Sequence, residues 1–406
     1  NIPIQFESNQ PKKGWFPNYN STFKLIVPRD FSYFEEVLLK PFFKLSFSEL
    51  LELDAIMSEE GKNVSINGKF SDASSVPLNQ ILFGPPGTGK TYNTVNWALE
   101  ILGKKQDKDE ERKVFVDNFR HRLIIDIEKD KDNPEKRIIF TTFHQSYSYE
   151  DFIEGIKPVM DEENEELKYA IKDGVFKQIS LRAKNDPENR YALFIDEINR
   201  GNVANIFGEL ITLIEPDKRA GMDNALSVKL PYSKTIFSVP NNLDIIGTMN
   251  TADRSVEALD TALRRRFEFE EMLPNSSLLS NIRCEDIKLD RMLNTINGRI
   301  EKLLDKDHQI GHSYFMNSNN TLSKSDLQGI FKNKIMPLLQ EYFYGDFGKI
   351  GLVLGNSFIK ENKEKIDFSK FPYDDRDLID ERKVYQLSDI ENLEATEFKS
   401  IYEKSE

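Results

Sequence analysis

The chain has 406 residues, a formal net charge of -13 and one cysteine, Cys284. This length allows roughly two or three domains with sizeable cores, and the acidic total argues against a broad duplex-DNA surface on the chain itself. No apolar run approaches the ~18 residues of a membrane span, no signal-peptide pattern opens the chain, and one cysteine allows no internal disulfide, so we expect a reducing, cytoplasmic location without membrane contact.

The N-terminal part, residues 1–76, carries no motif that assigns a role. It begins irregularly, with several prolines, and continues into a helix-like patch at residues 31–56. We expect a linker or part of a recognition module. The chain opens with Asn1 rather than Met, so either its start is trimmed or a longer N-terminal part is missing.

Residues 77–274 alternate short apolar strands with helical segments. Fully apolar strands that alternate with helices predict a parallel sheet covered on both faces. Two insertions, at residues 156–171 and 225–240, have the pattern of β-hairpins, which are either surface hairpins or loops that line the pore of a ring. The expected strands of the sheet are residues 80–83, 137–143, 191–196, 243–249 and 266–272.

A mainly helical domain is expected at residues 275–375. Apolar residues recur at helical spacing in segments 287–307 and 327–346, and strand signals stop. The last residues, 376–406, are rich in Asp, Glu and Lys and predict a C-terminal tail.

The motif GPPGTGKT, residues 84–91, lies between an apolar strand and a helical segment, the context of a phosphate-binding loop. Its glycines allow backbone angles that other residues resist, so that backbone N–H groups and the helix N-terminus can surround phosphate oxygens. Lys90 would reach the outer phosphates. The expected nucleotide-binding residues are Gly84, Pro85, Pro86, Gly87, Thr88, Gly89, Lys90, Thr91 and Tyr92.

A second motif, LFIDEINR at residues 193–200, ends an apolar strand in Asp196 and Glu197. We expect Asp196 and Thr91 to hold Mg²⁺, and Glu197 to polarise the attacking water as general base. An Asp-Glu pair alone is usually a helix cap or a solvated feature, but the phosphate loop favours the catalytic interpretation. A carboxylate in the position of a base indicates a hydrolase rather than a kinase, which would also need a site for an acceptor.

Asn250 ends another apolar strand, which we place beside the strand of Asp196. There its amide would contact the γ-phosphate and the attacking water, as a sensor. The alternative is that Asn250 only caps the turn.

Three consecutive arginines follow, at positions 264 to 266. An arginine stabilises charge that develops on a γ-phosphoryl group. We expect a finger supplied in trans to the next subunit of a ring, with Arg265 as first choice, Arg264 as second, and Arg266 as a structural residue. The alternative is a solvated basic helix end that the helix dipole stabilises.

These motifs, in this order, resemble those of the AAA+ ring ATPases, and MNTADRS at residues 249–255 resembles the signature of the McrB family. McrB proteins are the NTPase motors of the modification-dependent McrBC restriction systems. The resemblance implies an α/β AAA+ P-loop fold with a five-stranded parallel sheet sandwiched by helices, followed by a helical lid domain. It covers residues 78–355, through FHQSYSYEDFIEGIKP, DEINRGNVANIFGELITLIE, LDTALRRRF, IGHSYF and IMPLLQEYFYGDFGKI.

The resemblance also implies homohexameric rings with nucleotide at subunit interfaces, and a partner nuclease, McrC, that stimulates hydrolysis. The motor would power DNA translocation for that nuclease in the restriction of modified foreign DNA, and DNA would be contacted through the ring assembly or a missing N-terminal module. The family implies GTP, whereas Thr88 stands in the loop as in ordinary ATPases. Base choice depends on contacts to the purine edge, so ATP remains the alternative.

Asp253 and Arg254 follow the sensor asparagine within the signature. We hypothesise that Asp253 orients a neighbouring arginine, in cis or in trans, and that Arg254 shapes the sensor loop. Through this loop the partner nuclease would then control the attack of water on the γ-phosphate. The alternative is a local salt bridge that fixes the turn.

Two other classes of function are open. A MoxR-like or dynein-related AAA+ ATPase that remodels protein complexes would share the phosphate loop but not MNTADRS, and DNA or a nuclease subunit would not stimulate it. A nucleotide-gated assembly scaffold need not keep a general base, so turnover abolished by Glu197→Gln would reject it.

Overall fold

The computed structural model describes residues 77–103, 112–127, 129–130, 133–161, 166–253, 261–317, 319–364, 369 and 383–403. The expectations for residues 1–76 and for Arg254 therefore lie outside the described residues. Within those ranges, no helix is both long enough and apolar enough to cross a membrane.

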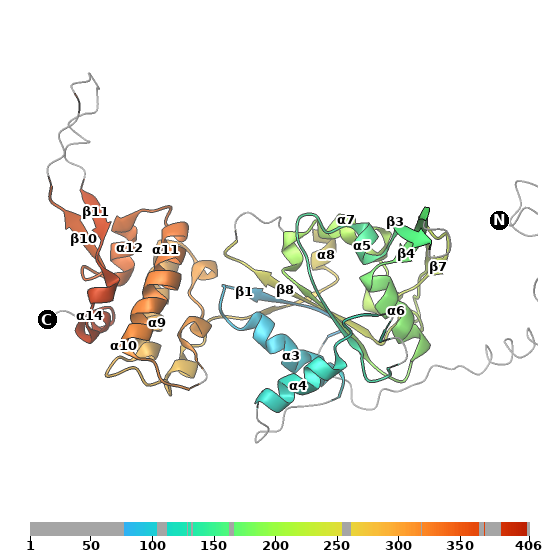
Figure 1. Cartoon of the computed structure of the whole chain (residues 1–406), viewed down its shortest axis with the longest axis horizontal. Helices are drawn as coiled ribbons and strands as arrows, with labels where there is room; N and C mark the ends of the chain where they lie inside the picture. The colour runs from blue at the N-terminus through green and yellow to red at the C-terminus, as the bar shows by residue number, and fades with distance from the viewer. Residues whose placement is uncertain are drawn as a thin grey trace, which may run out of the picture. The chain divides into compact units, whose positions relative to one another are not determined.

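A five-stranded parallel sheet forms the centre of the α/β domain (Figure 1). Its strands, in spatial order, are β2 (Ile138–Thr142), β5 (Tyr191–Asp196), β8 (Leu243–Asn250), β1 (Asn79–Gly84) and β9 (Glu268–Glu271). Gly84 at the end of β1 is the register partner of Asn250 at the end of β8. Because parallel strands all end at the same edge of a sheet, the phosphate loop, the acidic motif and the sensor asparagine meet there.

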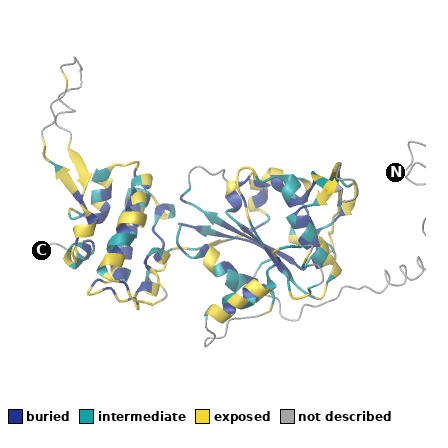
Figure 2. Cartoon of the chain, viewed as in Figure 1, coloured by how far each residue is buried: buried dark blue, intermediate teal, exposed yellow. Residues whose placement is uncertain are grey.

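The strands of the sheet are mostly buried (Figure 2). Alternate residues along them enter two different cores, one on each face of the sheet. On β1, Leu82 belongs to the core with α3 and α4, whereas Ile81 belongs to the core with α5, α6 and α7. The predicted sheet, parallel and sandwiched by helices, is confirmed. The covering helices are α3 (Lys90–Ile101), α4 (Arg112–Arg122), α5 (Tyr149–Phe152), α6 (Val175–Asn185) and α7 (Val203–Phe207).

Both insertions are antiparallel hairpins, and one buried carboxylate joins them. Glu154 accepts hydrogen bonds from the backbone N–H groups of Tyr232 and Ser233, each at 2.9 Å, and from Nζ of Lys177 at 2.7 Å. A role for the hairpins in lining a pore stays a prediction. The strands are β3 (Glu154–Asp161) with β4 (Glu166–Asp173), and β6 (Val228–Lys229) with β7 (Ile236–Phe237).

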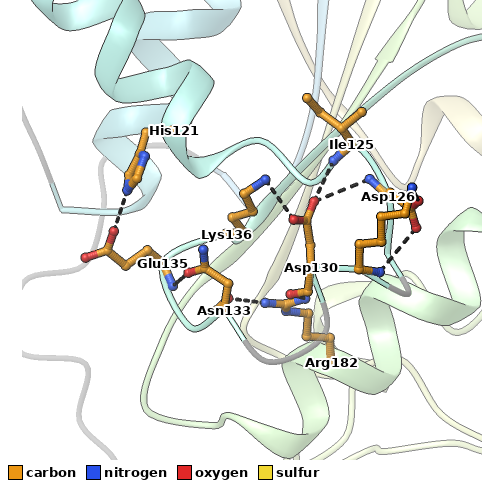
Figure 3. Close-up of polar contacts among 9 residues, drawn as sticks. His121, Ile125, Asp126, Asp130, Asn133, Glu135, Lys136 and Arg182 are labelled. Atoms are coloured by element: carbon orange, nitrogen blue, oxygen red, sulfur yellow. Dashed lines mark hydrogen bonds and ion pairs between the residues drawn. The ribbon is translucent and has the colours of Figure 1, made fainter.

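Charged side chains fix the loop that leads into β2 (Figure 3). The carboxylate of Asp130 accepts from the N–H groups of Ile125 at 3.1 Å and Asp126 at 3.3 Å, and pairs with Lys136 at 2.8 Å. Arg182 of α6 donates to the carbonyl oxygen of Asp130 at 2.7 Å. These contacts tie the loop to α6 and need no ligand to explain them.

The second domain is the predicted helical lid. Its longest helix buries one face at helical spacing, including Met292, Leu293, Ile296 and Ile300. A capping box at Ser323 begins the next helix. The helices are α9 (Leu289–Leu303), α10 (Lys324–Ile330), α11 (Met336–Tyr342) and α12 (Phe347–Leu354), with a π turn at Phe331–Ile335 between α10 and α11.

The described part of the C-terminal segment, residues 383–403, differs from the tail expected at residues 376–406. Phe398 is fully buried and packs edge-on against Phe331 and Phe358 of the lid core. The few apolar side chains that enter this core are spread among charged residues, so composition alone predicted only a tail. The elements concerned are β11 (Val384–Leu387), which pairs with β10 (Ile359–Asn362), and α14 (Ala395–Lys399).

Candidate nucleotide site

The phosphate loop turns sharply between β1 and α3. Its glycines have positive φ angles of 148° at Gly84, 77° at Gly87 and 87° at Gly89, a region that other residues rarely adopt. Gly84 also has no room for a side chain, since a Cβ atom there would lie 2.4 Å from the carbonyl oxygen of Met272. The loop conformation that the motif predicts is therefore built into the fold.

Lys90 is buried at the start of α3, within this loop. Its Nζ atom donates to the carbonyl oxygens of Gly84 at 2.9 Å and Pro85 at 2.7 Å. Burial lowers the pKa of Lys90 to about 8, and the nearby carboxylate of Glu197 opposes this effect. The side chain therefore keeps its positive charge at neutral pH inside the loop.

Tyr92 follows the loop on the exposed side of α3. The guanidinium carbon of Arg112 lies 4.0 Å from the centroid of its ring, and Arg112 also donates to the carbonyl oxygen of Tyr92 at 2.8 Å. This pairing ties α4 to the first turn of α3. A contact between Tyr92 and nucleotide stays a prediction.

Thr91 and Asp196 come together from different elements. Thr91 Oγ1 donates to Asp196 Oδ1 at 3.2 Å. A hydroxyl and a carboxylate are the hard oxygen ligands that Mg²⁺ takes together with phosphate oxygens and water. Among the described residues no group of three or more His, Cys, Asp or Glu side chains could hold a metal. The pair thus fits a magnesium ion that is held partly by nucleotide.

Thr248 of β8 is a site residue that sequence reasoning missed. Its hydroxyl donates to the same Oδ1 atom of Asp196 and accepts from the backbone N–H of Glu197 at 3.2 Å. The available signal was a hydroxyl within the otherwise apolar run at residues 245–249. Thr248 holds the two acidic residues in register with β8.

Glu197 and Asn250 are in direct contact. Asn250 Nδ2 donates to Glu197 Oε1, and Arg200 Nε lies 3.2 Å from Oε2. Glu197 has a φ of 53°, and such left-handed strain in a residue other than glycine is concentrated at functional sites. Burial raises the pKa of Glu197, whereas Arg200 lowers it. The structure thus brings the expected base and the expected sensor together.

The arginine beside Asp253 is Arg200 of the same chain, which sequence reasoning did not single out. Its guanidinium pairs with Asp253 Oδ2 at 2.7 Å while its Nε faces Glu197. The side chains of Arg200 and Asp253 are 48% and 31% exposed, so solvent screens the pair. One side chain therefore links the signature loop to the expected base.

The three arginines have different surroundings. Arg266 pairs with Glu215 at 2.7 Å, consistent with a structural role. Arg264, in α8 (Thr261–Arg264), lies with its guanidinium carbon 5.7 Å from the centroid of the Phe269 ring. Arg265 is exposed and forms no ion pair with any residue in the part of the chain that the structure describes.

Comparison with known proteins identifies the family. Residues 288–351 match the McrB alpha-helical lid domain, and residues 132–267 match the AAA domain of the dynein-related subfamily. The chain is also 36% identical over 290 residues to the type IV methyl-directed restriction enzyme EcoKMcrB subunit of Escherichia coli strain K12. The chain belongs to the McrB family of AAA+ NTPases.

The McrB-family match covers 67% of this chain and 55% of the Escherichia coli subunit, so the chain spans about half the length of that relative. A second relative is the type II restriction enzyme BsuMI component YdiS of Bacillus subtilis strain 168. It is 26% identical over an alignment of 359 residues, which covers 78% of this chain and 93% of that protein.

Proposed function

We propose that this chain hydrolyses GTP with Mg²⁺, and that hydrolysis drives DNA translocation for a separate McrC-like nuclease that restricts modified foreign DNA. The contact of Glu197 with Asn250, beside the Thr91–Asp196 pair, carries the hydrolase part of the proposal. A partly buried carboxylate next to a metal-binding pair is suited to accept a proton from water.

Each side chain has a role that its position supports. Lys90 and the loop N–H groups hold the phosphate oxygens, and Thr91 with Asp196 would hold Mg²⁺, which neutralises charge on those oxygens when it is bound. Glu197 accepts the proton of the attacking water. Asn250 keeps that carboxylate in place and contacts the γ-phosphate. Because burial raises the pKa of Glu197, its ionised form is a stronger base than a solvated carboxylate.

The proposed assembly is a homohexameric ring in which Arg265, or else Arg264, serves the nucleotide of the next subunit. The exposure of Arg265 supports this, because a finger must be free to reach another chain. Rings mixed from Glu197→Gln and Arg265→Ala subunits provide the test. Neither variant should hydrolyse alone, whereas mixing should restore turnover at interfaces that combine an intact base with an intact arginine. Mixtures without activity would contradict supply in trans.

The restriction context rests on the two relatives, which are named as components of restriction enzymes. The net charge of -13 favours DNA contact through the assembled ring or a separate module over a broad surface on each chain. The preference for GTP rests on family resemblance, with ATP as the alternative.

We propose that Asp253 acts through Arg200. This is the neighbouring arginine that Asp253 is expected to orient. A partner that moves the signature loop would move Asp253, and Arg200 would transmit this to Glu197 because it contacts both carboxylates. A local salt bridge that only fixes the turn is the alternative.

A second candidate is a protein-remodelling ATPase, which the match to the dynein-related AAA subfamily favours. The match of the lid to the McrB lid favours the restriction motor. Phosphate release with GTP and with ATP, each with and without a McrC-like nuclease, separates the two. Turnover that is selective for GTP and raised by the nuclease is expected. Turnover that is selective for ATP and indifferent to the nuclease would favour remodelling.

A further inference from the structure

A short segment of the lid, residues 310–314, lies directly on the phosphate loop, and we call it the strap. The backbone N–H of Gly311 donates to the carbonyl oxygen of Pro86 at 3.1 Å, and that of Ser313 donates to the carbonyl oxygen of Gly87 at 3.0 Å. Two successive peptide groups of the phosphate loop are therefore held by the lid.

The approach is too close for any side chain at Gly311. A Cβ atom there would lie 2.0 Å from the carbonyl carbon and oxygen of Gly87. The φ and ψ angles of Gly311, -69° and 152°, suit any residue. Glycine is thus needed here for the contact with the loop and not for its own backbone conformation.

The strap is itself held firmly. The side-chain amide of Asn297 in α9 accepts from the N–H of Ile310 at 2.7 Å and donates to its carbonyl oxygen at 2.9 Å. The buried ring of His312 accepts at Nδ1 from the N–H of Asn275 at 3.1 Å. The strap is therefore anchored to α9 and to the segment that follows β9.

The orientation of these peptide groups has a consequence for anion binding. In a trans peptide the C=O and the following N–H point in opposite directions. When the strap holds the carbonyls of Pro86 and Gly87, the N–H groups of Gly87 and Thr88 point to the other side of the loop. Phosphate loops bind their anion through such N–H groups.

We propose that the strap is a working part of the phosphate site, and that Gly311 and Ser313 are positioning residues that aim the N–H groups of Gly87 and Thr88 at the nucleotide phosphates. This rests on the proposed nucleotide-binding role of the loop. The lid thereby contributes to phosphate affinity without itself touching phosphate through these two residues.

The test compares Gly311→Ala with a matched control, Gly298→Ala in α9, where an added Cβ meets nothing within 4 Å. Equilibrium binding is measured with fluorescent GTP and GDP analogues, with tripolyphosphate as competitor. Gly311→Ala should weaken all three by about tenfold or more, the effect expected when charge-assisted hydrogen bonds are lost. Gly298→Ala should bind as the wild type does.

Unchanged binding by folded Gly311→Ala would overturn the inference. So would a loss for GTP without a loss for tripolyphosphate, because the strap would then act on the base or ribose. Wild-type protein that binds neither GTP nor ATP would contradict the proposed function and, with it, the role of the strap.

Hydrogen exchange of the nucleotide-free wild-type protein tests the contact without a substitution. The amides of Gly311 and Ser313 should exchange slowly because both are hydrogen-bonded to the loop. Exchange of both at the rate of exposed amides would overturn the inference even where Gly311→Ala fails to fold.

Discussion

Both ends of the parallel sheet carry polar side chains, but these side chains have different roles at each end. At the amino end, the guanidinium of the fully buried Arg219 donates to the carbonyl oxygens of Ile214, Pro240 and Leu243 and to the side-chain oxygen of Asn79. At the carboxyl end, Glu197 has a left-handed backbone, and its partner Arg200 is half exposed.

The comparison indicates different roles for the polar side chains at the two ends of the sheet. A buried guanidinium whose three nitrogen atoms all donate to acceptors stabilises the connections between strands. A carboxylate with a strained backbone, held by the Asn250 amide and by a half-exposed arginine, is typical of a functional site. We therefore expect substitutions at the amino end to change stability, and those at the carboxyl end to change nucleotide binding and turnover.

The largest effect on nucleotide binding is expected for Lys90→Ala, at the carboxyl end. Removing a buried cation from the phosphate loop should weaken GTP binding by about 100-fold or more, since charged hydrogen bonds to phosphate are lost. The free energy of unfolding should change little, because burial of the charged ammonium is itself unfavourable and the substitution removes that cost. Titration of a fluorescent GTP analogue, with urea unfolding of the same preparation, measures both. Wild-type affinity in the variant would remove Lys90 from the site.

At the amino end, Arg219→Met should lower the free energy of unfolding by about 3 kcal/mol, because several buried acceptors lose their donor. Turnover per folded molecule should be unchanged. Urea unfolding checks the first result and phosphate release the second, with the exposed position Lys229→Met as control. A stable Arg219→Met protein with impaired turnover would reverse the assignment of the two ends.

Asp244, also at the amino end, predicts a pH dependence of stability. Burial raises the pKa of Asp244 to about 6, and the pairing with Arg190 opposes this. A folded-state pKa above the unfolded value means that the folded state holds the proton more tightly. The contribution of Asp244 to stability is thus fully present at low pH and lost as pH rises through about 6, by up to ~1.4 kcal/mol per unit.

The measurement for Asp244 is urea unfolding of the wild type and Asp244→Asn at pH values from about 4 to about 8, which span the unfolded and folded pKa values. The stability of the wild type relative to the variant should fall with rising pH up to about 6 and then level off. A difference that is independent of pH would show that Asp244 stays charged throughout.

The smallest effect on stability is expected for Asp253→Ala. Its ion pair with Arg200 is partly exposed, so the free energy of unfolding should change by less than about 1 kcal/mol. Turnover stimulated by a McrC-like nuclease should nevertheless fall if Asp253 acts through Arg200. Phosphate release with and without the nuclease measures this. A variant that keeps both basal and stimulated turnover would leave Asp253 as a local salt bridge.

The sequence predicted those parts of the fold and site that depend on local patterns. Apolar strands predicted the sheet, and the glycines of the phosphate loop predicted its positive φ angles. The strand ends also predicted that Glu197 and Asn250 would lie close together, because parallel strands end at one edge.

Contacts between segments far apart in the chain were not predicted. Arg200 belongs to the motif at residues 193–200, whose predicted role rests on its two carboxylates. Its ion pair with Asp253 depends on how the loops after β5 and β8 lie in the folded protein. Gly311 carried no signal of its close approach to Gly87, and Phe398 was one apolar residue among charges. Such contacts depend on tertiary packing, which the spacing of apolar residues along the sequence does not reveal.

The central claim is that the carboxyl end of the sheet hydrolyses nucleotide with Glu197 as its base. The most direct measurement is phosphate release by Glu197→Gln beside the wild type, with GTP and with ATP, and with binding of a fluorescent GTP analogue measured in parallel. We expect turnover to fall by about 100-fold to 10,000-fold while binding is kept, as for the loss of a general base. Wild-type turnover in Glu197→Gln would contradict the account.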